Sequence, residues 1–418
     1  MTGRIALLTG ARVKIGYEIG LKLLRAGATL VATTRFPADA AKRYAAEPDF
    51  ASWRHRLHIH AVDLRDISAL EGFCEFLKGT LPRLDVIVNN ACQTVRRPAS
   101  YYSHLLPAER RIEAALRAKR VRDVDSASGD ETDGRNDDST AAMLPLLAQH
   151  EGWARTRRSQ GGGARQLAAR GMGGTDGDAL GGGVDKGCVD DDGEFYPTAA
   201  ELSQLKLAPE DHSTGVTPGV NGELPEGRLD VNGQQIDLRT HNSWLLKLED
   251  VSVPELVEVM AINTLAPFLL NSRLQPLLAA TAKAGAPTDG ATAGDGPAAP
   301  GAAFIVNVSA MEGKFYRYKT PNHPHTNMAK AALNMMTRTS AGELAERDRV
   351  YMTAVDTGWI NDENPRDRAA RTAEVHHFQT PIDEVDAAAR VLHPVFHGVA
   401  TGKPLFGVFL KDFVSTEW

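Results

Sequence analysis

The stretch that decides the fold runs from Ile5 to Gly16 and reads IALLTGARVKIG. Its first four residues are apolar, as in a short buried strand, and a glycine-bearing turn follows from Thr9. The pattern at residues 17–25 is that of an amphipathic helix. In such a strand–turn–helix unit, glycines let the backbone approach a pyrophosphate, and free N–H groups of the helix favour the anion. The stretch therefore predicts a dinucleotide phosphate site, which the rest of the chain has to support.

Strand and helix patterns alternate beyond this unit. We predict further strands at residues 28–34, 57–62 and 84–88, with helices at 38–44 and 70–77 between them. The pattern resumes after residue 243, with predicted helices at 254–278, 327–344 and 382–396 and strands at 303–308, 350–355 and 405–410. Alternation at this spacing predicts an α/β fold with a doubly wound parallel sheet and helices on both faces.

The alternation is interrupted twice. Residues 101–242 are charged, glycine-rich and weakly periodic, and a structureless loop of that length is unusual inside a compact domain. We therefore predict a largely disordered insertion, although the apolar patches at 143–147, 202–207 and 231–238 leave a small second domain as the alternative. Residues 283–301 are rich in Ala, Gly and Pro and predict a flexible loop. Residues 1–100 and 243–418 would then form one domain.

Composition narrows the classes of function. The chain of 418 residues has a net charge of −6, which argues against nucleic-acid binding through bulk charge. Its three cysteines are scattered without metal-ligand spacing, so we expect neither disulfides nor a metal site. We expect no membrane span from the apolar runs, and the first strand starts too close to Met1 for a signal peptide. We expect a soluble cytoplasmic protein without nucleic-acid or membrane partners.

Taken in order, the motifs of the chain resemble those of the short-chain dehydrogenase/reductase family. They are the phosphate turn, an acidic residue after the third strand, an Asn-Asn-Ala motif, an asparagine and a lysine on two later helices, and a glycine loop, found at Thr9-Gly10, Gly16, Asp63-Leu64, Asn89-Asn90-Ala91, Asn263, Lys330 and Gly358. The resemblance implies a Rossmann fold, a nicotinamide cofactor, and a small carbonyl, alcohol or imine substrate. It also implies a homo-oligomer formed through the helices of Asn263 and Lys330.

The same resemblance implies which residues contact the cofactor, namely Gly10, Arg12, Lys14, Ile15, Gly16, Arg35, Asp63, Leu64, Asn90, Ala91, Lys330 and Gly358. Lys14 departs from the pattern, because a glycine is usual at its position. The second strand ends at Arg35 without the carboxylate that commonly binds the ribose 2′-hydroxyl of NAD. A basic group there suits the 2′-phosphate of NADP, and Lys14 supplies a second cation. We therefore predict NADP(H) in preference to NAD(H).

The catalytic positions depart further from the family. Its serine, tyrosine, lysine and asparagine act together, with the tyrosine donating the proton. Counting back four residues from Lys330 reaches Thr326 instead of a tyrosine, and Ser309 lies one residue before the aligned serine position. Of these four catalytic residue types, this sequence has the asparagine and the lysine at the expected positions, as Asn263 and Lys330.

Three interpretations remain open for the proton. In the first, a nearby tyrosine or histidine donates it, with candidates at Tyr316, Tyr318, His323 and His325. In the second, water or a substrate group is the donor and is held by Thr326 and Lys330. In the third, the chain binds NADP(H) without turnover, as a sensor or scaffold. Separately, Arg96-Arg97 could bind an anionic substrate or simply start the insertion as solvated charges.

Overall fold

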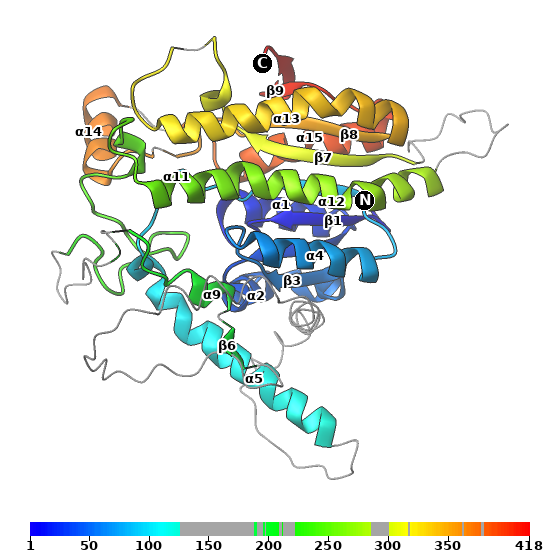
Figure 1. Ribbon diagram of the computed structural model, residues 1–418, viewed down its shortest axis with the longest axis horizontal. Coiled ribbons are helices and arrows are strands. Elements are labelled where there is room, and N and C mark those ends of the chain that lie inside the picture. The colour runs from blue at the N-terminus through cyan, green and yellow to red at the C-terminus, as the bar shows by residue number, and fades with distance from the viewer. Residues whose placement is uncertain are drawn as a thin grey trace.

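The computed structural model describes residues 1–125, 188–189, 195–196, 198–208, 211, 222–285, 301–316, 318–361, 363–377 and 380–418. Its main sheet has eight strands in the order β10-β9-β8-β7-β4-β1-β2-β3. All neighbouring pairs are parallel except β9 and β10 (Figure 1). Their bounds are β1 Ile5–Thr9, β2 Thr29–Thr34, β3 Leu57–Ala61, β4 Val86–Asn89, β7 Ala303–Ser309, β8 Val350–Asp356, β9 Phe409–Lys411 and β10 Val414–Thr416. The predicted α/β fold is confirmed.

Helices cover both faces of this sheet (Figure 1). One face carries α1 (Lys14–Arg25), α2 (Pro37–Ala45) and α15 (Glu384–Thr401), and the other carries α4 (Ile67–Thr80), α12 (Ala266–Ala284) and α13 (Pro324–Asp348). The apolar sequence of β1 is explained by the packing of its two faces. Ala6 and Leu8 pack into the first core, while Ile5 and Leu7 pack into the second, so both faces of the strand are covered.

The order of the strands places a crevice above the centre of the sheet. The chain passes from β1 outward to β2 and β3, then returns to β4 on the other side of β1. In doubly wound sheets, ligands bind outside the carboxyl ends of the strands at this reversal. The residues that follow β1 and β4, including the phosphate turn, therefore meet at the same edge.

The predicted helix 254–278 is divided. The structure has α11 (Val253–Met260), a π-helical turn at Ala261–Leu265, and then α12. Pro267 near the start of α12 lacks an N–H for the carbonyl four residues earlier, so a regular helical bond is missing there. By length and composition Val253–Ala284 would pass as a membrane span, contrary to the expectation from the apolar runs. In this fold, however, α12 packs against α4 in the second core.

The insertion is described in part, and several of the described parts contact the domain. A 3-10 helix at Ala99–Leu105 leads into α5 (Leu106–Asp125), and α9 (Ala199–Leu202) returns to the domain (Figure 1). The insertion also contains the strand pair β5 (Cys188–Val189) and β6 (Phe195–Tyr196). Outside the insertion, the domain has two further helices, α3 (Phe50–Trp53) and α14 (Arg366–His376). Most of 101–242, and residues 286–300 of the predicted loop, lie outside the described residues, so both predictions stay predictions.

Glu109 of α5 connects the insertion to α2. Its two carboxylate oxygens accept hydrogen bonds from the backbone N–H groups of Ala38 (3.0 Å) and Asp39 (3.1 Å), in the first turn of α2. Phe36, which precedes α2, has no side chain able to cap these groups. Glu109 thus acts as a cap supplied from another helix. Burial raises its pKa to about 7, although the two capping bonds favour the charged form.

This shift predicts a pH dependence of stability. Between the ordinary pKa of a glutamate and 7, the folded protein binds more protons at Glu109 than the unfolded chain, so stability falls as pH rises through that window and is constant above it. Glu109→Gln removes this component, which is on the order of 3 kcal/mol. Chemical denaturation at pH 5 and pH 8 should therefore show a steeper loss in wild type than in the variant. Equal losses in the two proteins would contradict the assignment.

Candidate functional site

The phosphate turn brings backbone groups unusually close together. Gly10 adopts a φ of +70°, and a Cβ placed on Gly16 would lie 2.0 Å from the Gly10 carbonyl oxygen. Only glycine fits at position 16, which explains the spacing of the motif. Lys14 opens α1 with a φ of 53°, a left-handed conformation that costs a lysine more than a glycine. The side chain of Val13, at the N-cap of α1, makes no capping hydrogen bond, and the first helical residues, Lys14 to Gly16, line the cavity described below.

The turn is attached directly to the end of β4. The Thr9 hydroxyl accepts hydrogen bonds from the backbone N–H groups of Asn90 and Ala91, each at 3.0 Å. In return, the Asn90 side-chain amide donates to the Thr9 carbonyl at 3.0 Å. The Asn-Asn-Ala motif therefore fixes the position of the phosphate turn relative to the centre of the sheet.

A cavity of about 380 Å³ opens at this edge of the sheet. Most of the predicted cofactor residues line it, namely Gly10, Arg12, Lys14, Ile15, Gly16, Arg35, Asp63, Leu64, Asn90 and Ala91. Of the predicted cofactor residues, Lys330 and Gly358 are not part of its lining. The arrangement brings the predicted residues together, and their contact with a cofactor stays a prediction.

Two groups of basic residues in this cavity differ in their partners. Arg12 is buried in an ion pair with Asp39 at 2.7 Å, and Arg43 binds the same carboxylate. By contrast, neither Lys14 nor Arg35 has an ion pair within the described ranges. Arg35 instead lies over the Tyr102 ring, with 4.5 Å between its guanidinium carbon and the ring centroid. Lys14 and Arg35 are the cations left to bind an anion.

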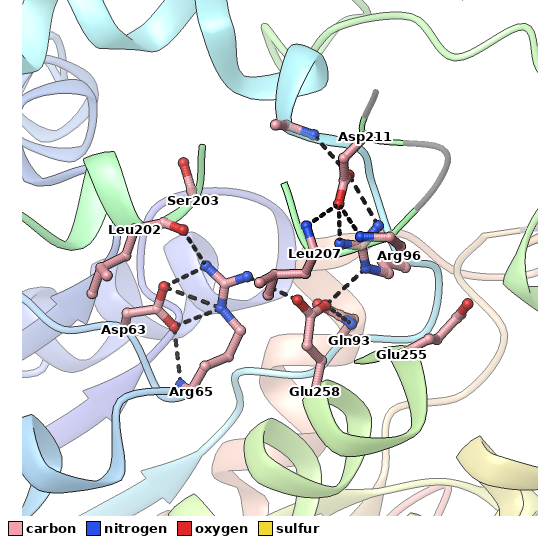
Figure 2. Close-up of polar contacts among 12 residues, drawn as sticks. Asp63, Arg65, Gln93, Arg96, Leu202, Ser203, Leu207, Asp211, Glu255 and Glu258 are labelled. Atoms are coloured by element: carbon pink, nitrogen blue, oxygen red, sulfur yellow. Dashed lines mark hydrogen bonds and ion pairs between the residues drawn. The ribbon is translucent and has the colours of Figure 1, made fainter. Parts of the chain in front are cut away.

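Asp63, one of the predicted cofactor contacts, is held by its neighbour Arg65. The guanidinium of Arg65 donates to both oxygens of Asp63, at 3.0 and 2.7 Å, and also to Glu258 of α11 and to the Leu202 carbonyl (Figure 2). Burial alone would raise the pKa of Asp63, but the Arg65 charge outweighs it and keeps that pKa below its ordinary value. The carboxylate is therefore ionised and oriented at neutral pH.

Arg96 continues the same network into the insertion. It binds Asp211 through two parallel hydrogen bonds of 3.0 and 2.6 Å and contacts Glu258 at 3.1 Å (Figure 2). Asp211 also accepts backbone N–H groups from Leu207 and Ala208. Arg96 is thus a buried anchor for the insertion, which contradicts the hypothesis that it binds a substrate. Its neighbour Arg97 pairs with Asp237.

The predicted catalytic residues lie between β7, α13 and the π-helical turn. The Lys330 ammonium donates to the Val308 carbonyl at 2.9 Å, and the Ser309 hydroxyl donates to the Asn334 side chain at 2.6 Å. Thr326 lies one helical turn before Lys330 on the same face of α13, and its buried hydroxyl has no hydrogen-bond partner among the described residues. Asn263 binds the backbone N–H and carbonyl of Gln93 at 2.8 and 3.0 Å, which fixes the loop after β4.

The other proton-donor candidates lie in different surroundings. Tyr318 is 90% exposed and Tyr316 is half-exposed, with its ring near the Lys314 ammonium. His323 stacks on Trp244 at 3.7 Å and hydrogen-bonds its carbonyl through Nδ1. Buried His325 lies 3.5 Å from a Glu255 oxygen. None of these four side chains lines the described cavity, and no group of His, Cys, Asp and Glu within the described chain has the arrangement of a metal site.

Sequence reasoning missed one wall of the cavity. Tyr101, Tyr102 and Gln234 from the insertion line it, together with Ile360, Asn361 and Glu363 from the loop after β8. The two adjacent tyrosines soon after Pro98 were the available signal, but nothing in their spacing shows which part of the domain they contact. The insertion therefore contributes to the cavity instead of only lying beside it.

The sheet order, the phosphate turn and the cavity at the strand ends together define a Rossmann-like α/β domain. Residues 4–116 match the family model described as short chain dehydrogenase. This part of the chain, less than half of its length, is therefore similar to the short-chain dehydrogenase/reductase family.

Individual relatives match the chain to different extents. "Uncharacterized protein R665" of Acanthamoeba polyphaga mimivirus is 24% identical over 405 residues, covering 94% of this chain and 63% of that protein. "Carbonyl reductase [NADPH] 1" of Sus scrofa is 36% identical over 89 residues, covering 21% of this chain and 30% of that protein. The chain thus spans less than two thirds of the length of these curated relatives. A solved carveol dehydrogenase from Mycobacterium avium in complex with NAD has a TM-score of 0.49 at 14% identity, over 98% of this chain and 96% of that one.

The buried network predicts a large effect of one substitution. Asp211→Asn removes a charge from a pair whose side chains are 5% and 1% exposed, and should lower the free energy of unfolding by about 3 kcal/mol. Glu71→Gln is the matched control, because its pair with Arg273 is half exposed and should contribute less than about 1 kcal/mol. Urea denaturation of the two variants measures both values. Similar losses in both would show that the Arg96 network does not anchor the insertion.

Proposed function

We propose that the protein is an NADP(H)-dependent oxidoreductase that acts on a small carbonyl, alcohol or imine substrate. The observation that carries the proposal is the pair of cations, Lys14 and Arg35, that face one cavity without an ion pair in the described structure. The cavity lies where the first turn of α1 favours anions, and a third cation, Arg12, is already neutralised by Asp39. A 2′-phosphate beside the pyrophosphate would satisfy both free charges.

The residues around Lys330 would orient the substrate relative to the nicotinamide. A bound nicotinamide would accept or deliver the hydride. Lys330 is a buried ammonium that already binds the Val308 carbonyl, and its remaining protons are available for a ribose or substrate hydroxyl. Asn263 holds the loop after β4 in place through Gln93. The substrate would therefore be placed between α13 and the cofactor crevice.

We further propose that the proton comes from water or from a substrate group held by Thr326 and Lys330. The unpaired, buried Thr326 hydroxyl supports this, because such a group gains stability when a ligand or water binds it. A threonine is too weak an acid to replace a tyrosine alone. The alternative donors Tyr316 and Tyr318 lie on an exposed loop, and His325 is buried against Glu255.

A second candidate is a protein that binds NADP(H) without turnover. It is favoured by the internal bond of Ser309, whose hydroxyl donates to Asn334 and not toward the cavity. The two candidates share the cofactor site and differ only in the chemistry at Lys330.

Fluorescence titration tests the shared site. Wild type should bind NADPH more tightly than NADH, and Lys14→Gly should weaken NADPH binding about tenfold with little effect on NADH. Glycine also accepts the positive φ at this position, so the variant should stay folded. Lys42→Ala, on the exposed side of α2, is the control. Absence of coenzyme binding in wild type would refute both candidates.

Activity measurements on wild type and variants distinguish the oxidoreductase from the protein that binds NADP(H) without turnover. Carbonyl-dependent loss of NADPH absorbance, screened over ketones, aldehydes, quinones and pterins, supports the enzyme, and Lys330→Ala should abolish it. Tight binding without turnover on any of these substrates would support the sensor. Unchanged turnover in Lys330→Ala would show that the assignment of Lys330 is wrong.

We also propose a homo-oligomer formed through α11, α12 and α13. Exposed apolar side chains gather on these helices and on the π-helical turn between α11 and α12, at Val257, Leu265, Phe268, Met328 and Met335. Phe268→Glu combined with Met335→Glu should convert the oligomer to a monomer, because each places a charge in the buried contact. Light scattering after size-exclusion chromatography measures the mass. Val375→Glu on α14 is the control, and a wild-type monomer would refute the proposal.

A further inference from the structure

Tyr102, a residue of the insertion, contacts Arg35, which we predict to bind the 2′-phosphate of NADP(H). It lies on the 3-10 helix Ala99–Leu105 and lines the cavity opposite the end of β2. The guanidinium of Arg35 lies over the Tyr102 ring at 4.5 Å and over the Phe36 ring at 5.5 Å. The two rings stack on each other, with centroids 5.3 Å apart and planes 27° from parallel. Arg35 is therefore bounded by two aromatic faces.

The position of Tyr102 is itself well fixed. Phe36 forms a small core with Leu105 and Ala200 from the insertion, and Tyr102 and Leu106 pack against it. The Tyr101 ring contacts Tyr102 edge to face at 5.0 Å. Further along the chain, Glu109 caps α2 and holds α5 against the domain. The ring can therefore restrict Arg35 instead of moving with it.

The pKa of Tyr102 is consistent with its contact with the Arg35 cation. Burial favours the neutral phenol, but the adjacent Arg35 cation, with Arg97 and Arg12 further away, lowers the pKa of Tyr102 below its ordinary value. Arg35 has no ion pair in the described structure that would compete for its charge. Stacking on a ring orients a guanidinium and leaves hydrogen-bond donors at its edge free for an anion.

We propose that Tyr102 is a positioning residue for coenzyme selectivity, because it holds Arg35 in the orientation that receives the 2′-phosphate of NADP(H). This inference rests on the proposed function. It adds that the selectivity is built partly by the insertion, from a residue outside the β2 and α1 segments that bear the cations. A flexible arginine loses conformational freedom when it binds phosphate, and an arginine already held by a ring loses less.

The experiment compares NADPH and NADH dissociation constants by fluorescence titration. Tyr102→Ala should weaken NADPH binding about tenfold and change NADH binding less than about twofold. Tyr102→Phe keeps the ring and should restore most of the selectivity. If Tyr102 acts through Arg35, the double variant Arg35→Gln with Tyr102→Ala should match Arg35→Gln alone. Leu106→Ala, which loosens the same core but leaves the ring, should lower thermal stability and keep the selectivity ratio.

The outcomes separate this inference from the proposed function. Wild-type preference for NADPH with an unchanged ratio in Tyr102→Ala would overturn the role of Tyr102 alone. Tighter NADPH binding in Tyr102→Ala would show that the ring obstructs the coenzyme, which also overturns it. Equal loss of NADPH and NADH binding in Tyr102→Ala and Leu106→Ala would show only a packing role. If the wild-type protein binds neither NADPH nor NADH, both the proposed function and this inference are refuted.

Discussion

The structure depends on the close junction between the ends of β1 and β4. Thr9 and Asn90 exchange hydrogen bonds there, and Gly16 approaches the Gly10 carbonyl so closely that no side chain fits. Because β1 and β4 flank the reversal of strand order, the same junction fixes both the sheet centre and the start of α1. The position of the crevice and of the phosphate turn beside it follows from this contact.

The elements that sequence reasoning predicted well are those whose signal is local. The apolar run before Thr9 and the alternation after it were sufficient for the sheet, because its central strands are buried on both faces. The division of the helix at Ala261–Leu265 was missed, since it depends on a backbone bond that Pro267 cannot make. Strand β10 was also missed, because a three-residue edge strand carries little periodicity.

The candidate site was predictable only where a residue type determines its own role. Glycines and the Asn-Asn-Ala motif could be placed from sequence, but the state of each arginine could not. Arg12 and Arg96 are buried in ion pairs with Asp39 and Asp211, whereas Arg35 contacts rings. These partners come from distant parts of the chain, so tertiary structure decides which cations can meet a ligand. The same holds for Thr326, because its surroundings and not its spacing determine what it binds.

The contact between Arg96 and Asp211 has a consequence for the architecture of the chain. Asp211 also accepts the Ala99 N–H, so the chain leaves the domain and returns to it at the same place. The free-energy cost of closing a loop between two fixed points rises only slowly with its length. The cost of closing the segment between Ala99 and Asp211 therefore depends only weakly on the number of residues in it. The anchor thereby keeps the described parts of the insertion, including Tyr102 and Glu109, beside the crevice and the helix that they contact.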